Sequence, residues 1–287
     1  MSIFSQSEFD SARLRYFENK LIKKYPFIKK QCIGYTALSK PINAYTVGDN
    51  GSAIICAAFH ALERVTSAIL MRYIFEKAEE HKNGVSLSFT AIPMINPDGV
   101  DISIHGIRAA EKFMPLIISR TNGDTRSWQA NARGVDINHN FNANFLSVRK
   151  NEIKSGYILS GPTRFGGGCP ESEKETRAIV NFCKKNNFSS AVALHSQGRE
   201  IYYDFKNCAK KSEKIAQEMS KLSGYTLSSP ESIATGGGFK DWFCEYFHRA
   251  GITLEIGLGK NPLDKSVADT EYDLVAKMLD VVVLQQC

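Results

Sequence analysis

Two histidines and two glutamates stand where they could hold a metal ion and use it for hydrolysis. His60 and Glu63 are three residues apart, and His195 and Glu255 lie at or close to the ends of short apolar runs further along the chain. Two histidines and one glutamate form the ligand set of a catalytic zinc site, which keeps a fourth position open for water. Zinc acts there as a Lewis acid, and a second carboxylate is needed as general base. The residues therefore predict metal-assisted hydrolysis, with the roles of the two glutamates open.

The segment around His60 is expected to be a corner between a strand and a helix. Residues 52–59 form an apolar run that is too short for a helix, and apolar residues then recur at helical spacing from residue 62 to residue 73. A strand end and the first helical turn can direct a histidine and a carboxylate onto one ion. Short motifs of this kind are more often a corner histidine beside a glutamate that suits the helix dipole. Residues further along the chain are needed to distinguish a metal site from an ordinary corner histidine.

The rest of the chain alternates apolar strands with amphipathic helices. Further strands are expected at residues 28–37, 41–48, 85–92, 190–194, 201–205 and 252–256. Helices are expected from a capping box at Ser7 to before Pro26, at 62–81, at 170–185, at 210–222, around Trp242 and at 267–284. Residues 96–99 have the composition of a compact turn, and residues 106–160 that of a long irregular connection, which is usually functional.

This alternation predicts an α/β fold. We expect a single domain over residues 1–287, with a mixed, largely parallel central sheet covered by helices on both faces. Ligand sites in open α/β sheets lie beyond the carboxyl ends of the strands. His60, His195 and Glu255 are each expected near such an end, and a glutamate in an otherwise apolar strand is costly to bury without a purpose.

Composition and charge exclude several functional classes. The 287 residues are 43% hydrophobic and 23% charged, as in an ordinary globular protein, and the net charge of +6 is not arranged as a basic stripe, so no nucleic acid partner is expected. The seven cysteines include no C-x-x-C pair, which argues against both a disulfide framework and a zinc-thiolate site. No signal peptide or membrane span is recognisable, so we expect a cytoplasmic protein with no membrane partner. His81, His105 and His248 have no motif around them and are expected to be ordinary surface or core residues.

Five pieces of the sequence together resemble the zinc metallocarboxypeptidases of the funnelin type. They are residues 60–63, 96–99, 131–141, 195–198 and 253–257, and they occur in the order and with the spacing of that family. The resemblance implies the carboxypeptidase fold and one zinc ion. It also implies that His60, Glu63 and His195 are the zinc ligands and that Glu255 is the general acid/base.

The same resemblance implies roles for residues in the third of these pieces, 131–141. Asp136 would hold His60 in the correct tautomer. Arg133 would stabilise the developing oxyanion, with Arg126 as a competitor for that role. Asn138 would contact the substrate carboxylate, next to His139, which stands where the carboxypeptidases carry an arginine. Because histidine cannot grip a carboxylate with a bidentate fork, this departure puts binding of an ordinary C-terminal carboxylate in question.

Residues 138–145, 161–168 and 237–243 resemble the bacterial branch of the family. That branch cleaves γ-D-glutamyl-meso-diaminopimelate bonds in cell-wall peptides, which implies a peptide or muropeptide substrate. Three other functions stay open: an ordinary metallocarboxypeptidase, an N-acyl amino acid deacylase, and a muropeptide-binding sensor without activity.

Overall fold

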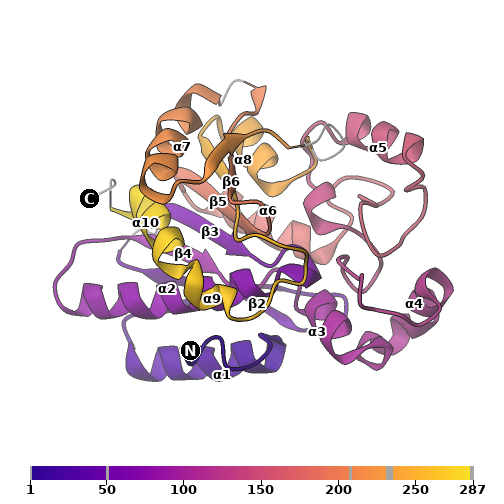
Figure 1. Cartoon of the computed structure of the whole chain (residues 1–287), viewed down its shortest axis with the longest axis horizontal. Coiled ribbons are helices and arrows are strands. Elements are labelled where there is room, and N and C mark those ends of the chain that lie inside the picture. Colours follow the sequence, from indigo (N-terminus) through magenta and orange to yellow (C-terminus); the bar gives the residue numbers. More distant parts are fainter. Residues whose placement is uncertain (1, 50–51, 207–208, 231–234, 285–287) are drawn as a thin grey trace.

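A mixed sheet runs through the whole molecule (Figure 1). The computed structural model describes residues 2–49, 52–206, 209–230 and 235–284. Within these ranges the strand order is β1-β2-β4-β3-β5-β8-β6-β7. The strands are β1 (Lys29–Tyr35), β2 (Pro41–Val47), β3 (Ala53–Ala57), β4 (Phe89–Ile92), β5 (Ser190–His195), β6 (Glu200–Tyr202), β7 (Thr226–Ser228) and β8 (Ala250–Glu255). The central strands β4, β3, β5 and β8 are parallel, and antiparallel pairs join β2 to β4 and β6 to β8. The predicted α/β fold with a mixed, largely parallel sheet is confirmed.

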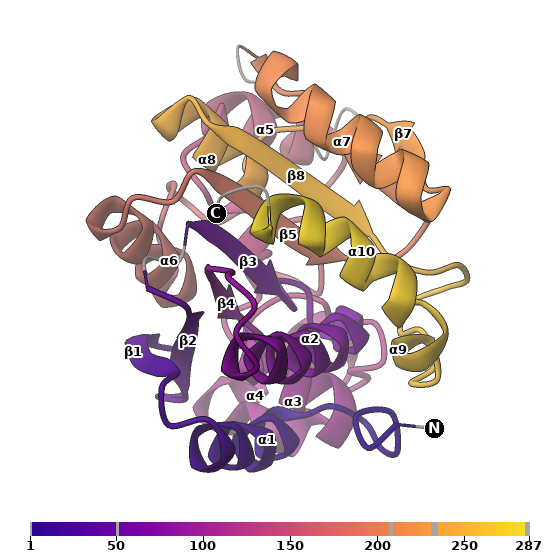
Figure 2. The ribbon, with the colours of Figure 1, turned by 90° about the vertical axis from the view of Figure 1, so that its left-hand side faces the viewer.

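Helices cover both faces of the sheet. One face packs on α1 (Ser11–Lys24), α2 (Val65–Lys82), α7 (Ala209–Ser223) and α10 (Tyr272–Val283), and the other on α6 (Lys174–Lys185) and α8 (Phe239–Phe247). In Figure 2 the helix α10 crosses in front of β5. The sequence of β3 is a continuous apolar run because both faces of this strand are buried. Ile55 packs in the core on the α1, α2, α7 and α10 side, and Ile54 packs in the core on the α6 and α8 side.

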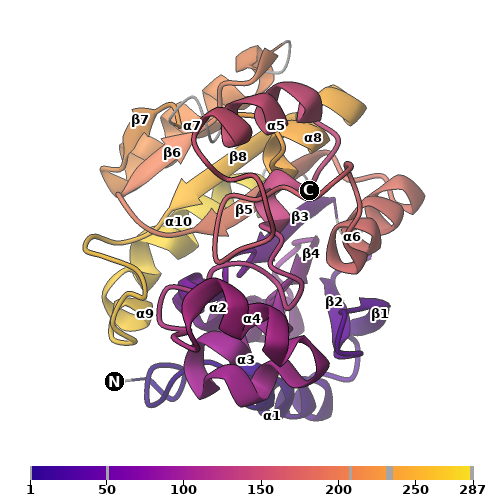
Figure 3. The same ribbon diagram turned by 90° about the vertical axis from the view of Figure 1, so that its right-hand side faces the viewer.

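The carboxyl ends of the central strands face a third group of elements. These are α3 (Pro97–His105), α4 (Met114–Thr121) and α5 (Phe145–Lys154), with the 3₁₀ turns η2 (Ile107–Phe113) and η3 (Ile137–His139). Figure 3 looks onto this side of the molecule. The expectation that residues 106–160 lack regular structure is therefore wrong in part. Short helices form there around a small separate core that includes Trp128 and Ile117.

Three predicted boundaries need correction. Residues 96–99 open the helix α3, because Asn96 accepts a hydrogen bond from the backbone of Gly99 as an N-cap. The cap of α1 is Asp10 rather than Ser7, with Oδ1 accepting from Arg13 N at 2.7 Å. The helix expected from Pro170 begins only at Lys174.

The closing helix is also interrupted. Residues 267–284 form α9 (Val267–Thr270) and α10, with Glu271 between them. The carboxylate of Glu271 accepts hydrogen bonds from Arg199 and from the hydroxyl of Tyr225. No helix within the described ranges is both long and apolar enough to cross a membrane.

Candidate metal centre and catalytic site

The corner after β3 brings His60 to the carboxyl edge of the sheet. Ala58 has a left-handed backbone (φ 49°), which turns the chain sharply after the strand. The buried side chain of Asn96 holds the corner, since its Nδ2 donates to the carbonyl of Phe59 at 3.2 Å and to that of Ala130 at 3.1 Å. This one amide joins the corner, the start of α3 and the polar loop.

The three predicted metal ligands converge on one point. His60 Nδ1 lies 2.8 Å from Glu63 Oε1, and His195 Nδ1 lies 2.8 Å from Glu63 Oε2. One ligand atom from each residue lies within 4.8 Å of the others. His195 is the last residue of β5, and Glu63 ends the 3₁₀ turn η1 (Ala61–Glu63) that follows His60.

The donor set suits zinc. Two imidazole nitrogens and one carboxylate are ligands that zinc prefers, and they leave room for a further ligand. Nε2 of His60 lies 3.0 Å from Asp136 Oδ1. Because an ionised carboxylate can only accept, this contact favours the tautomer of His60 that carries its proton on Nε2 and leaves the Nδ1 lone pair for a metal. The ring of Phe59 stacks on that of His195 at 5.3 Å and fixes its orientation.

The charges of the cluster stabilise one another. Burial opposes ionisation of Glu63, but His60 and His195 outweigh it and lower the pKa of Glu63 to about 2. Burial likewise opposes charge on His60, while Glu63 and Asp136 on either side of the ring outweigh it and raise the pKa of His60. Asp136 has a lowered pKa because His60 and His139 outweigh its burial. The carboxylates are thus ionised, the form in which they can hold a cation or orient a ligand.

Glu255 lies beside the cluster without belonging to it. It ends β8 and pairs in register with His195 on β5. Burial raises its pKa well above that of an ordinary glutamate, and the negative charge of Glu63 raises it further. Once ionised, a carboxylate with a raised pKa is a stronger base, so next to a metal centre it can take up a proton and return it during a reaction.

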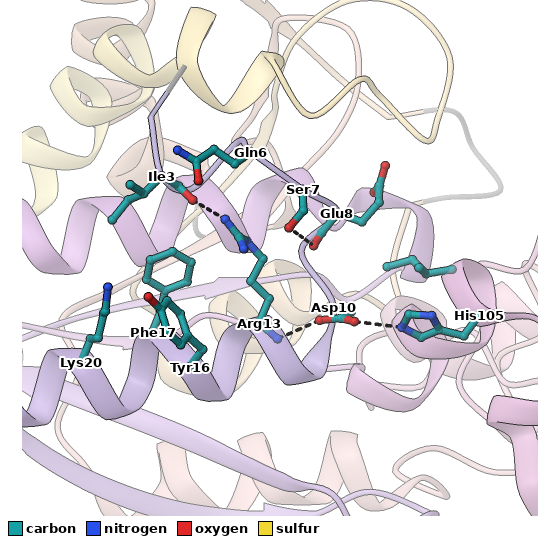
Figure 4. Close-up of a pocket in the computed structure, with 11 residues that line it drawn as sticks. Ile3, Gln6, Ser7, Glu8, Asp10, Arg13, Tyr16, Phe17, Lys20 and His105 are labelled. Atoms are coloured by element: carbon teal, nitrogen blue, oxygen red, sulfur yellow. Dashed lines mark hydrogen bonds and ion pairs between the residues drawn. The ribbon is translucent and has the colours of Figure 1, made fainter.

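Two cavities adjoin the cluster. One of about 360 Å³ is lined by His60, Glu63, Gln129, Asp136, His139, Arg164, Ser196, Gln197, Tyr202, Pro230, Glu255 and Asn261. The other, of about 100 Å³, is lined by His60, Asn138, His139, His195, Tyr202, Pro230, Gly238, Lys240, Asp241, Thr253 and Glu255. A larger cavity of about 520 Å³ lies by the N-terminal helix α1, as Figure 4 shows. We assign the site by its chemistry rather than by size, because that larger cavity contains none of the converging residues.

Asn138 and His139 both line the smaller cavity at the metal cluster. Asn138 Oδ1 accepts from Phe239 N at 3.0 Å, so its Nδ2 hydrogens are the donors that it can offer to a ligand. His139 lines both cavities, and its Nδ1 lies 2.8 Å from the buried carboxylate of Glu152. The close backbone approach of Gly237 holds this turn, since a Cβ there (φ +72°) would lie 3.0 Å from the carbonyl oxygen of His139.

The structure does not bring Arg133 or Arg126 to the site. Arg133 is 57% exposed and its Nε lies 3.2 Å from Glu173. Arg126 is 89% exposed and pairs with Asp124. Neither lines the two cavities at the metal cluster. The oxyanion role expected for Arg133 stays a prediction, and its guanidinium is paired with the buried carboxylate of Glu173.

Other polar residues line the two cavities at the metal cluster. Gln129 and Arg164 line the cavity of about 360 Å³, and the backbone N–H of Arg164 donates to Asp136 Oδ2 at 3.0 Å. Lys240 and Asp241 line the smaller one. The sequence does show Lys240 and Asp241 as a charged pair at the start of an otherwise apolar helix. Gln129 and Arg164 lie in irregular segments, and only the packing of these segments brings them to the cavity.

Comparisons with known proteins agree with this site. Residues 15–280 match the family model for zinc carboxypeptidases. The chain is 33% identical over 285 residues to γ-D-glutamyl-L-diamino acid endopeptidase 1 of Lysinibacillus sphaericus, covering 93% of this chain and 70% of that protein.

Solved structures show the same fold. Bovine thrombin-activatable fibrinolysis inhibitor, in complex with tick carboxypeptidase inhibitor, superposes with a TM-score of 0.76 at 19% identity over 98% of this chain and 97% of that one. Murein-tripeptide amidase MpaA from Escherichia coli O157 superposes with a TM-score of 0.57 at 20% identity over 88% and 91%. We conclude that this chain belongs to the zinc carboxypeptidase family and is a metallopeptidase.

Proposed function

We propose that this metallopeptidase hydrolyses the amide bond between a γ-D-glutamyl residue and a diamino acid of the diaminopimelate type in cell-wall peptides. The observation that carries the proposal is the convergence of His60, Glu63 and His195 beside Glu255, in a chain that shares 33% of its residues with an endopeptidase named for that bond. The single catalytic domain over residues 1–287 and the cytoplasmic location expected from the sequence stay predictions.

The proposed chemistry divides among this chain's own residues. When bound to His60, Glu63 and His195, zinc would polarise the scissile carbonyl and lower the pKa of a coordinated water to about 7. Glu255 would take a proton from the attacking water and pass it to the leaving amine, a role that suits a carboxyl group with a raised pKa. Gln129 and Arg164 would donate hydrogen bonds to the oxygen on which negative charge develops.

The substrate carboxylate would be bound on the other side of the cluster. Asn138 offers its Nδ2 hydrogens there, as the contact of its Oδ1 with Phe239 directs. His139 donates from Nδ1 to Glu152, which leaves Nε2 as the nitrogen that can face the substrate. A single imidazole nitrogen forms one hydrogen bond where an arginine would form two, so recognition must draw on further contacts.

The first experiment measures zinc content and hydrolysis with the zinc-reconstituted full chain and with Glu255→Gln. Substrates are a γ-D-glutamyl-meso-diaminopimelate peptide, an α-linked dipeptide with an ordinary C-terminal residue, and an N-acetyl amino acid. We expect one zinc in both proteins, fastest turnover of the γ-glutamyl peptide, and a loss of roughly 10² to 10⁴-fold in kcat for the variant.

Each other outcome corrects a defined part of the proposal. Faster turnover of the α-linked dipeptide or of the N-acetyl amino acid would make the chain an ordinary carboxypeptidase or a deacylase. Tight binding of the muropeptide without turnover in the wild type would favour the sensor. Full activity of Glu255→Gln would remove Glu255 from the mechanism.

A further inference from the structure

Two adjacent residues of opposite charge line the small cavity beside the metal cluster. Lys240 and Asp241 lie in the first turn of α8, and the cavity that they line is shared with Glu255 and Asn138. Their side chains are only 6% and 4% exposed, and Lys240 Nζ lies 2.6 Å from Asp241 Oδ1. The two opposite charges thus lie within ion-pair distance at the wall of the reaction cavity, and Asp241 Oδ1 forms no hydrogen bond among the described residues.

Each charge is anchored from outside the cavity. Lys240 Nζ donates to the backbone carbonyl of Asp204 at 3.2 Å and lies 5.5 Å from the ring centre of Phe205. Asp241 Oδ2 accepts from the backbone N–H of Gly236 at 2.7 Å. An ammonium group has three hydrogens and a carboxylate has about four acceptor positions. Both groups therefore retain hydrogen-bonding capacity for a ligand.

Stability alone gives a poor account of this pair. Taking two charges out of water costs several kcal/mol per ion, and a buried ion pair can often be replaced by apolar residues without loss of stability. The neighbours of Lys240 and Asp241 on α8, Phe239 and Trp242, are fully buried apolar residues of the kind that such a replacement would use. A pair kept in the cavity wall instead suggests that its charges meet a ligand.

We propose that Lys240 and Asp241 recognise the head group of an amino acid at the far end of the substrate side chain. Lys240 binds its carboxylate and Asp241 its ammonium group, so that four charges of alternating sign meet. A leaving residue that carries both groups beyond its reacting end is a diaminopimelate-type diamino acid. L-lysine carries the distal ammonium but lacks the distal carboxylate. The inference rests on the proposed function and names the residues that select its substrate.

The size of the cavity agrees with a small polar head group. Its volume is about 100 Å³, well above the roughly 10 to 15 Å³ that a cavity needs to hold one water molecule. A buried polar site also rejects a ligand that lacks a partner group, because its own charges are then left unpaired. Selection should therefore act against substrates that lack either distal charge.

The experiment compares three γ-D-glutamyl peptides on the zinc-loaded full chain. Their second residues are meso-diaminopimelate, L-lysine, which lacks the distal carboxylate, and L-2-aminopimelate, which lacks the distal ammonium. We expect kcat/KM for the first to exceed each of the others by roughly tenfold or more, as for a lost hydrogen bond to a charged group. Lys240→Met should abolish the preference over the lysine peptide, and Asp241→Asn that over the aminopimelate peptide.

The matched control is Lys206→Met. Lys206 also lies over the ring of Phe205, at 5.2 Å, but pairs with Glu245 at the surface and does not line the cavity. It should keep both preferences. Because each preference is a ratio within one protein, partial loss of folded enzyme cancels, and Lys240→Gln serves if the methionine variant does not fold. Equal turnover of the three peptides by the wild type, or an unchanged ratio in Lys240→Met, would overturn the inference while leaving the proposed function standing.

Binding of the three free amino acids, measured by calorimetry, separates the remaining outcomes. If the wild type cleaves no γ-glutamyl peptide but binds meso-diaminopimelate selectively, and Lys240→Met does not, the proposed function fails and the inference holds. If it neither cleaves nor binds selectively, both fail.

Discussion

Two groups of three histidine and carboxylate residues in this molecule have similar spacing and different surroundings. His60, Glu63 and His195 form one, and Asp10, Asp101 and His105 form the other; in each, one ligand atom per residue lies within 4.8 Å of the others. The first is buried where three segments meet, whereas His105 is 51% exposed. By proximity alone, both could hold a metal ion.

The two groups differ in the hydrogen bonds that their carboxylate oxygens already accept. In the second group, Asp10 caps α1 through Arg13 N and contacts His105 at 2.9 Å, as Figure 4 shows. Asp101 accepts from the backbone and hydroxyl of Ser11 and from Lys40 Nζ at 2.8 Å. A cation bound there would have to displace a lysine and a helix cap. In the first group, among the described residues, the carboxylate of Glu63 is hydrogen-bonded to the two imidazoles, which can turn their lone pairs to a metal.

The largest expected effect is on zinc affinity, which should depend on the first group and not on the second. His195→Ala removes a direct ligand, so zinc affinity should fall by well over the roughly 10 to 100-fold that loss of a supporting hydrogen bond causes. His105→Ala should leave zinc affinity unchanged. Competition with a chelator, followed by mass spectrometry of the metal content, measures both. Equal zinc loss in the two variants would mean that the second group holds zinc as well as the first.

Glu175, a buried acid outside both groups, should make the stability of the protein depend on pH. Glu175 is fully buried, and its Oε1 has no hydrogen-bond partner among the described residues. Burial raises its pKa to about 7, and the charges of Asp98 and Glu173 add to the shift. Because the folded state holds this proton more tightly than the unfolded state, the stabilisation is complete below the unfolded pKa and is lost as pH rises through 7.

Glu175→Gln removes this titration. Between pH 5 and pH 8 the free energy of unfolding of the wild type should fall by about 2 to 3 kcal/mol relative to that of the variant. Urea denaturation at the two pH values measures it. Parallel pH profiles for the two proteins would mean that Glu175 is not the group responsible.

The smallest expected effect belongs to the cap at Asp10. Asp10→Ala should lower the free energy of unfolding by about 1 kcal/mol, the usual cost of losing an N-cap. Zinc content and activity should not change. Asp10→Asn is the matched control, since asparagine caps a helix equally well and loses only the exposed contact with His105, which is worth little. A loss of zinc with Asp10→Ala would instead link this group to the metal centre.

Much of this arrangement could be predicted from the sequence, because the relevant signals are local. The apolar run 53–57 marks a strand buried on both faces, and the helical spacing after it places the corner at His60. Strands that end in His195 and Glu255 bring those residues to one edge, since parallel strands share their direction. The chemistry expected at this edge therefore follows from residue type and from the positions of the strand ends.

The sequence by itself determined the fold class and the residues of the metal centre. Only the tertiary structure decided that Arg133 pairs with Glu173 and that Arg164 reaches one cavity at the cluster. It also decided that Lys240 and Asp241 line the other, smaller cavity. The physical reason is that the direction of a loop side chain depends on contacts with distant segments. Periodicity within the chain carries no record of those contacts.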